Sequence, residues 1–141
     1  MTRPTPARFM DTNILVRYFT GEPPDQAQRA RSLLKAVERG DEKVVTSVMV
    51  LFETIFTLQR TYRLPKQSIR ELVAGVFSLP ALLLPGKRLC LEALDLYAEQ
   101  PNLSYADAYN VLFMRGRRVT EAYTWDRDFD GVDGITRIEP A

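Results

Sequence analysis

Residues 8–19 read "RFMDTNILVRYF" and join a short apolar strand to an apolar helix. The segment "ARFM" (7–10) has the length and composition of a buried strand, and "NILVRYF" (13–19) predicts a helix that ends near Gly21. A charged residue, Asp11, stands where the strand gives way to the helix. A single carboxylate at this point can cap the helix. A chemical role requires that other carboxylates reach the same place in the fold.

Short apolar strands and amphipathic helices alternate along the rest of the chain. Further strands are expected at 43–47, 81–85, 119–124 and 134–140, and further helices at about 25–39, 48–62, 66–77, 87–100 and 104–116. Strands separated by helices indicate an α/β fold: a single three-layer domain with a central parallel sheet of four to five strands and helices on both faces. We expect residues 9–141 to form this domain, after a short flexible lead of residues 1–8.

The composition is that of an ordinary folded domain. The 141 residues are 45% hydrophobic, which provides enough apolar surface for a core. The one cysteine, Cys90, cannot form an internal disulfide; we expect it in the core of a cytoplasmic protein. No apolar stretch approaches the roughly 18 residues of a membrane helix, so we expect no membrane association. With 19 basic and 18 acidic residues, the net charge of +1 neither requires nor excludes a nucleic-acid partner.

The sequence contains no histidine. This absence removes Ser-His-Asp and Cys-His nucleophilic sites, zinc sites with histidine ligands, and ribonuclease chemistry that relies on paired histidines. An enzyme built from this chain must therefore work with carboxylates, hydroxyls, amines or a metal ion.

Four acidic residues lie near the ends of predicted strands or the starts of predicted helices. They are Asp11 after the first strand, Glu53 on the helix after the second strand, Asp107 in the first turn of the helix at 104–116, and Asp126 after the fourth strand. Ligand sites of parallel α/β sheets form outside the carboxyl ends of the strands. We therefore expect these four side chains to meet at one edge of the sheet.

Three of these acids also have a purely structural interpretation. Asp11 can be a helix cap, Asp107 can complete a capping box with Ser104, and Asp126 can be a turn residue. Glu53 is different because its helical neighbours are mostly apolar and no Lys or Arg stands three or four residues away from it. A charged group on such a face needs a partner from elsewhere in the fold.

A cluster of these carboxylates would need a cation. Two carboxylates about 4 Å apart repel by roughly 4 kcal/mol at an effective dielectric constant near 20, so several together would otherwise bind protons. Oxygen ligands without histidine or cysteine favour Mg²⁺ or Mn²⁺ over zinc. Such an ion lowers the pKa of a bound water and stabilises a leaving oxygen, so that no protein nucleophile is required.

The motifs "FMDTN", "LFETIF", "SYADAYNVLF" and "TWDRDF" occur in this order over nearly the whole chain. Together they resemble a PIN domain, and most closely the small single-domain VapC toxins of prokaryotic toxin–antitoxin pairs. The resemblance implies a Mg²⁺- or Mn²⁺-dependent endoribonuclease, a hydrolase that cleaves RNA phosphodiester bonds with a metal-activated water. It assigns the metal and catalytic roles to Asp11, Glu53, Asp107 and Asp126, and a supporting role to Thr12, Asn13, Ser104 and Thr124. Whether Asp126 or Asp128 is the fourth acid, and whether one metal or two are bound, stays open.

The resemblance also implies partners. They are an RNA substrate of unknown identity, a cognate antitoxin that occupies the groove, and a second copy in a homodimer. The apolar helical segments 51–58 and 69–77 can serve either the core or such an interface. The basic residues Arg17, Arg115, Arg117 and Arg118 are candidates for phosphate contacts, or they are ordinary surface charges.

Other functions remain as alternatives. The domain can be a catalytically inert PIN-like binding module. The segment "DRDFDG" (126–131) matches the first half of a calcium-binding loop, but Arg137 stands at the twelfth position, where such a loop needs Glu. A receiver-type regulatory domain would need an acid after the third strand, and "ALLLPGK" (81–87) has none. Trp125 is expected to be a partly buried residue at a strand end, although it can also stack on a base.

Overall fold

The computed structural model describes residues 6–141. It confirms the alternation of short strands and helices. The helices are α1 (Thr12–Thr20), α2 (Pro24–Arg39), α3 (Val48–Arg60), α4 (Lys66–Phe77), α5 (Lys87–Glu99), α6 (Tyr105–Gly116) and the 3-10 helix η1 (Arg127–Gly131). The strands are β1 (Arg8–Phe9), β2 (Val44–Val45), β3 (Leu82–Leu83), β4 (Glu121–Tyr123) and β5 (Thr136–Ile138). Arg8 belongs to β1, and residues 1–5 of the predicted lead lie outside the described residues.

Polar side chains fix the starts of three helices, as their positions before apolar runs suggest. The side chains of Asp11, Ser47 and Ser104 each accept a hydrogen bond from a backbone N–H in the first turn of the following helix. Gly21 ends α1 with a φ of 77°, a left-handed conformation that suits glycine. The elements that carry the candidate acids therefore begin where the local sequence dictates.

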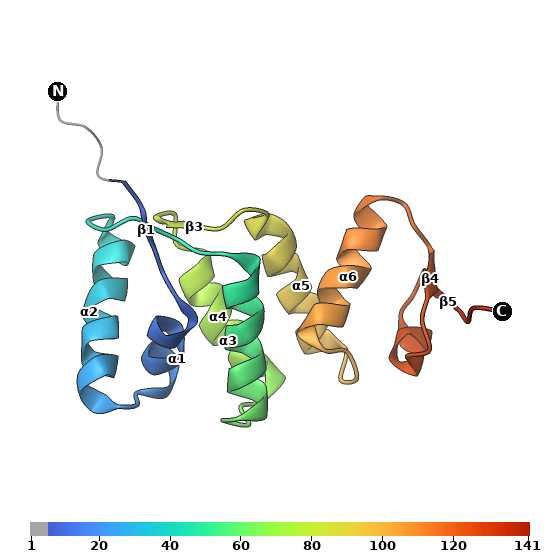
Figure 1. Cartoon of the computed structure of the whole chain (residues 1–141), viewed down its shortest axis with the longest axis horizontal. Coiled ribbons are helices and arrows are strands. Elements are labelled where there is room, and N and C mark those ends of the chain that lie inside the picture. Colours follow the sequence, from blue (N-terminus) through green and yellow to red (C-terminus); the bar gives the residue numbers. More distant parts are fainter. Residues whose placement is uncertain (1–5) are drawn as a thin grey trace.

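The five strands form two separate parallel sheets. The order β1-β2-β3 makes one sheet, in which Arg8 is level with Val44 and Val44 with Leu82; β4 and β5 make the other. The two sheets lie toward opposite ends of the longest axis of the molecule (Figure 1). The predicted single sheet of four to five strands is thus not present in residues 6–141. Strands of two or three residues give few ladder bonds, so helix packing decides where each sheet lies.

Helices cover only one face of the three-stranded sheet. Val44 and Leu82 share a row of this sheet and are buried, whereas the next row exposes Phe9 by 60% and Leu83 by 40%. Successive residues of a strand face opposite sides of the sheet, so the residues alternate between a face that the helices cover and a face that they leave open. The prediction of helices on both faces does not hold for this sheet in the described part of the chain.

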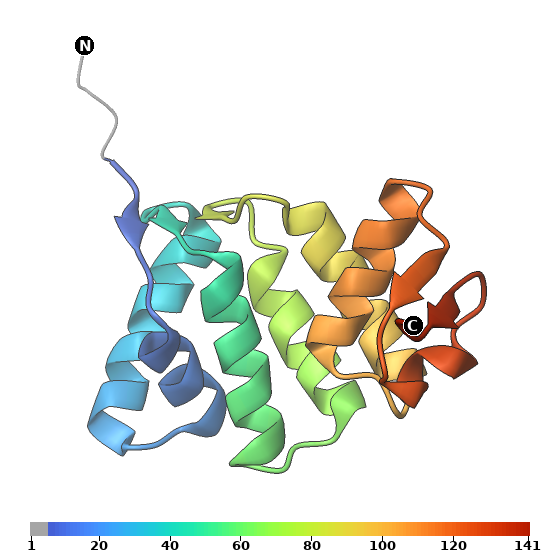
Figure 2. The ribbon, with the colours of Figure 1, turned by 45° about the vertical axis from the view of Figure 1, so that its right-hand side comes forward.

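The hydrophobic core is one cluster of buried side chains to which all six α-helices of the described residues contribute their buried faces. The stripe predicted for α4 is buried at Ile69, Val73, Val76 and Phe77, but Leu72 of the same stripe is exposed. Figure 2 shows α6 between the helices α3 and α5 on one side and the β4–β5 sheet on the other. Cys90 of α5 is fully buried, as expected. No helix within residues 6–141 is both long and apolar enough to span a membrane.

Candidate active site

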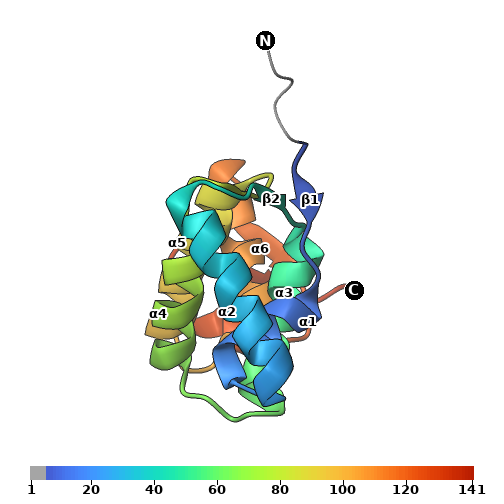
Figure 3. The ribbon, with the colours of Figure 1, turned by 90° about the vertical axis from the view of Figure 1, so that its left-hand side faces the viewer.

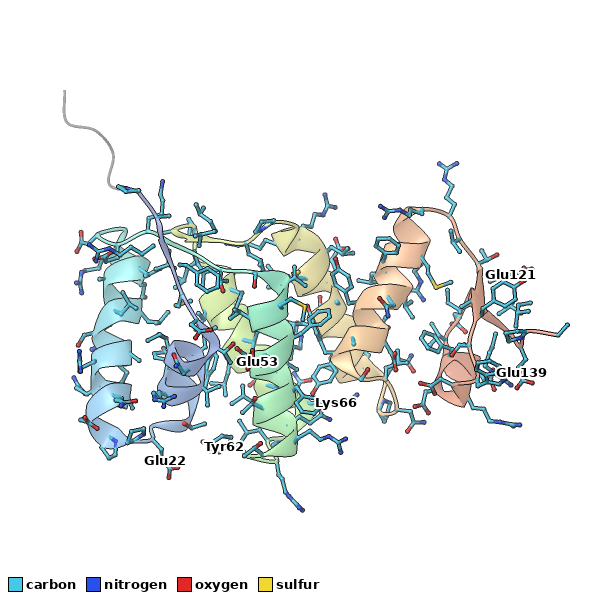
Figure 4. All side chains as sticks on the ribbon, in the orientation of Figure 1. Glu22, Glu53, Tyr62, Lys66, Glu121 and Glu139 are labelled. Carbon is cyan, nitrogen blue, oxygen red and sulfur yellow. The ribbon has the colours of Figure 1, made fainter. Side chains whose placement is uncertain are left out.

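Asp11 and Glu53 are linked through Thr12. Asp11 caps α1, where its Oδ1 accepts a hydrogen bond from Thr12 N–H at 2.8 Å. The Thr12 hydroxyl, which is almost fully buried, donates to Glu53 Oε2 at 3.1 Å. Glu53 extends from α3 toward α1 (Figure 4). Glu53 is exposed rather than buried among its apolar neighbours, and it accepts its hydrogen bond from a hydroxyl at the start of α1. We call Asp11 and Glu53 the first acidic group.

Asp107 lies with Asp126 and Asp128 in a second acidic group. Asp107 is in the first turn of α6, where its N–H donates to Ser104 Oγ at 3.1 Å. Burial, followed by the charges of Asp126 and Asp128, raises the pKa of Asp107, while hydrogen bonds from Ser104 act in the opposite direction. A carboxyl held half-buried beside two others favours a cation as a neighbour.

Asp126 and Asp128 both act on Asp107, and which of them is the fourth acid stays a prediction. Asp126 acts on the pKa of Asp107 more strongly than Asp128 does. Asp126 is also held in place: its N–H donates to Thr124 Oγ1 at 3.0 Å, and its Oδ1 accepts from Asp128 N–H at 2.9 Å as the cap of η1. Asp126 follows the end of β4 after two intervening residues rather than directly.

The calcium-loop interpretation finds no support at its fifth position. Asp130 Oδ1 accepts a hydrogen bond from Arg137 Nε at 2.9 Å, and Arg137 also pairs with Glu139 at 2.6 Å. The arginine that replaces the glutamate ligand thus neutralises one of the remaining carboxylates of the loop.

The two acidic groups do not form one cluster. Among residues 6–141, no three side chains of His, Cys, Asp or Glu lie close enough to hold one metal ion. One of these acids, Glu53, lines a pocket of about 530 Å³ between α3 and the start of α6. Glu53 lines it from one helix, and Ser104 and Ala106 line it from the other. The joint metal site of the four acids stays a prediction.

Three of the four predicted supporting residues contact a residue of an acidic group. Thr12 contacts Glu53 and Asp11, and the hydroxyls of Ser104 and Thr124 accept from the N–H groups of Asp107 and Asp126. Asn13 is exposed, and its carbonyl accepts a hydrogen bond from Arg17 Nη1 at 3.4 Å.

Lys66 has a structural role that the sequence interpretation missed. Its ammonium group donates to the carbonyls of Tyr97 at 3.1 Å, Gln100 at 2.8 Å and Leu103, and it lies 4.4 Å from the Tyr97 ring centroid. Lys66 thereby joins α4 to the turn that precedes α6 and its cap Ser104 (Figure 4). The sequence signal that could have revealed this role is the position of Lys66 in the first turn of a helix, because the helix dipole disfavours positive charge there.

The basic candidates for RNA contact lie on exposed surface except Arg17, which is half-buried. Arg17 also bonds to Gln26, the Arg117 guanidinium lies 3.9 Å from the Phe113 ring centroid, and Arg115 donates to the carbonyl of Asp133 at 3.1 Å. Arg118 follows α6 with a φ of 58°. The expectation that Trp125 is partly buried was wrong, because its exposure is 71%.

Comparison with known proteins identifies a family that this chain matches. A family model described as PIN domain matches residues 8–135. The chain is 28% identical over 131 residues to a VapC ribonuclease of Mycobacterium bovis and, to the same extent, to the ribonuclease VapC13 of Mycobacterium tuberculosis. Each alignment covers 92% of this chain and 98% of the relative. These matches do not favour a calcium-binding domain, a receiver domain or an inert module.

Proposed function

Because the chain belongs to the PIN domain family, we propose that it is a metal-dependent endoribonuclease that hydrolyses RNA phosphodiester bonds. The names of its two relatives, both ribonucleases, support this activity. The observation that carries the proposal is the pairing of Asp11 with Glu53 through Thr12, next to a pocket that also reaches the α6 end carrying Asp107. If Asp11 served only as a helix cap, nothing would require Glu53 to accept a hydrogen bond from the hydroxyl of the neighbouring Thr12.

The donor set fits a hard divalent cation. The candidate ligands are carboxylate oxygens of Asp11, Glu53, Asp107 and Asp126. Burial, followed by the charges of Asp126 and Asp128, raises the pKa of Asp107, and a cation bound beside these acids would offset that effect. When bound there, Mg²⁺ or Mn²⁺ would supply a water of lowered pKa and would stabilise the leaving oxygen.

The side chains divide the work. Asp11 and Asp107 are the proposed direct ligands of the ion, because each lies at a helix start with its backbone fixed by a cap. Glu53 and Asp126 hold a second ion, or position the attacking water and accept its proton. Thr12 and Thr124 orient these two acids through their hydroxyls.

Catalysis requires that the two acidic groups come together. We propose that β4 joins the free edge of β1 to complete a single parallel sheet of five strands. In parallel pairing, Asp11 and Asp126 both follow the carboxyl ends of adjacent strands, so they meet at one edge.

The proposed partners are an RNA and a cognate antitoxin. We propose that the basic side chains at the end of α6, Arg115, Arg117 and Arg118, contact phosphates, and their exposure supports this role. The pocket beside Glu53 is lined mainly by apolar residues of α3, among them Met49, Phe52 and Phe56, and it would accept apolar side chains of an antitoxin segment that blocks the acids.

Cleavage of total RNA tests the proposal. The purified protein should cleave RNA with Mn²⁺ or Mg²⁺, and EDTA should stop the reaction. Asp11→Asn should lose activity, whereas Asp25→Asn, an exposed acid in the first turn of α2, should retain it. Cleavage by Asp11→Asn at the wild-type rate would overturn the proposal.

A further inference from the structure

A second pocket, of about 380 Å³, lies between α1 and α2. Figure 3 looks onto this end of the molecule, with α2 facing the viewer and α1 next to it. The pocket is separate from the one beside Glu53 and shares no residue with it. Its lining combines polar and apolar side chains: Asn13, Arg17, Gln26 and Arg29, with Ile14, Ala30 and Leu33.

Arg17 is a half-buried cation whose hydrogen-bond partners are neutral. Its Nε donates to Gln26 Oε1, and its Nη1 donates to the carbonyl of Asn13 at 3.4 Å. Glu22 lines a neighbouring hollow together with Arg17, yet within residues 6–141 Arg17 forms no ion pair with a carboxylate. A guanidinium has more N–H donors than these two contacts use. Arg17 therefore retains both donors and charge for an anion.

Two other half-buried arginines are paired with carboxylates. Arg70 pairs with Asp95 at 2.8 Å, and Arg137 pairs with Asp130 at 2.9 Å. A partly buried charge needs such a partner because burial removes water from it. The neutral partners of Arg17 leave this need open on the side that faces the pocket.

Arg29 adds a second cation to the pocket from the opposite helix. Its side chain is exposed, and in the described part of the chain it too forms no ion pair with a carboxylate. Two cationic side chains on one pocket attract an anion. The planar fork of a guanidinium matches the oxygens of a phosphate group, which it can bind through two parallel hydrogen bonds.

The rest of the lining suits the other parts of a nucleotide. Asn13 and Gln26 carry amide groups that can donate to and accept from a sugar or a base, and the Gln26 N–H groups stay available while its oxygen accepts from Arg17. The apolar residues offer contact to a ring. The volume lies within the range of roughly 300–1,000 Å³ that is usual for small-ligand sites. A carboxylate of an acidic peptide would use the arginines alone.

One end of the pocket lies close to Asp11. Asn13 follows Asp11 after one residue, so their Cα atoms are at most about 7.6 Å apart. Arg17 lies about 6 Å further along the axis of α1. Between them, Thr12 donates its hydroxyl to Glu53 of α3. The start of α1 therefore has the first acidic group on one side and the pocket on the other.

We propose that the pocket between α1 and α2 is a subsite for one nucleotide of the RNA, next to the phosphodiester on which the acids act; this rests on the function proposed above. Arg17 and Arg29 bind the phosphate of that nucleotide, and Asn13 and Gln26 contact its sugar or base. A nucleotide enters a pocket between two helices only when its base is unpaired. The preferred substrate is then RNA that is single-stranded beside the cleaved bond.

Binding of a fluorescently labelled single-stranded RNA in EDTA tests the subsite without cleavage. We expect Arg29→Gln to weaken binding by about tenfold, because a hydrogen bond to a charged group is lost. Arg17→Lys keeps the charge but loses the fork, and it should weaken binding as well. The control is Arg39→Gln, which removes the same charge from the other end of α2, where Arg39 pairs with Asp41. It should bind like the wild type.

Two further arms identify the ligand. An RNA duplex should bind Arg29→Gln and the wild type equally, because its paired nucleotides do not enter the pocket. The free nucleotide 5′-AMP should compete with the single strand only at far higher concentration; competition at the same concentration would assign the pocket to a free nucleotide and overturn the RNA subsite.

The outcomes separate the subsite from the ribonuclease function. If Arg29→Gln and Arg39→Gln bind the single strand equally while the wild type cleaves RNA, the subsite is overturned and the function stands. The same holds if Arg17→Lys lowers the melting temperature but not the affinity and Arg29→Gln changes neither, since Arg17 then only joins α1 to α2. A wild-type protein that neither binds nor cleaves RNA would overturn both.

Discussion

Thr12 and Glu53 stand 41 residues apart in the sequence, yet the Thr12 hydroxyl donates to Glu53 Oε2 at 3.1 Å. Asp11 caps the same helix start through Thr12 N–H. One residue thus uses its backbone to hold one acid and its side chain to hold the other. This contact connects the β1–α1 junction to α3 and defines the first acidic group.

Thr12→Val should impair metal binding more than folding. The substitution removes the hydroxyl and keeps the shape, so Glu53 loses its donor and its orientation. Hydrogen bonds that orient ligands are typically worth about 10- to 100-fold in metal affinity. We expect the Mn²⁺ concentration for half-maximal cleavage to rise by that order.

The control for Thr12→Val is Thr20→Val. Thr20 lies on the same helix, and its hydroxyl donates to the carbonyl of Val16 at 2.7 Å, away from the acids. Equal Mn²⁺ requirements in the two variants would show that the contact between Thr12 and Glu53 has no part in metal binding.

Asp107→Asn should stabilise the metal-free protein at neutral pH. Burial and the neighbouring acids raise the pKa of Asp107 in the folded state. The folded state then binds more protons than the unfolded state between the unfolded pKa, about 3.9, and the raised value, so stability falls as pH rises through that window. The penalty is complete above the window, and Asn removes it.

Thermal unfolding in EDTA measures this effect. The melting temperature of Asp107→Asn should exceed that of the wild type at pH 7, and the difference should shrink toward pH 4. Added Mn²⁺ should reverse the order, because binding stabilises the wild type more. Asp25→Asn, in the first turn of α2, serves as the control; a melting temperature of Asp107→Asn no higher than this control would contradict the prediction.

Lys66→Met should destabilise the fold. Three backbone carbonyls around the turn after α5 accept from the ammonium group, and methionine would leave them without a donor. We expect a loss of about 2–4 kcal/mol in the free energy of unfolding, measured with urea. Lys35→Met, at an exposed position of α2, should change stability by less than about 0.5 kcal/mol. A loss of unfolding free energy for Lys66→Met as small as that of Lys35→Met would contradict the proposal that Lys66 stabilises the turn after α5.

Arg117→Ala combined with Arg118→Ala should weaken RNA binding with a shallower salt dependence. Each lost contact to a single-stranded phosphate should reduce the slope of log affinity against log salt by about 0.7. Arg88→Ala, an exposed arginine on α5, should leave the slope unchanged. An unchanged slope in the double variant would indicate that both arginines are ordinary surface charges.

Local sequence predicted the elements and their caps, but not the relation between the two sheets. Strand and helix positions follow from apolar periodicity. Asp11 and Ser104 are residue types that predict a helix start, and each caps the helix that follows it. The strand order depends on which edges meet in space, and two-residue strands such as β1 carry little information about their neighbours.

The same distinction holds for the acids. The apolar neighbours of Glu53 suggested a charged group on a buried face that needs a partner, but Glu53 is exposed in the structure. It does accept a hydrogen bond from Thr12, and nothing in the sequence pattern identified that residue. The exposure of Trp125 was also missed, because a tryptophan at a strand end is usually covered by the same sheet. In this fold the β4–β5 sheet leaves Trp125 exposed.

The central claim is that carboxylates from both acidic groups act as one catalytic unit. Single-turnover cleavage of one RNA at saturating Mn²⁺ tests it most directly, with Asp11→Asn, Asp107→Asn and the double variant. We predict that each single substitution slows cleavage by at least about 100-fold and that the double variant is no slower than the slower single variant, because members of a unit are not additive. Wild-type cleavage by either single variant, or losses that multiply in the double variant, would contradict the claim.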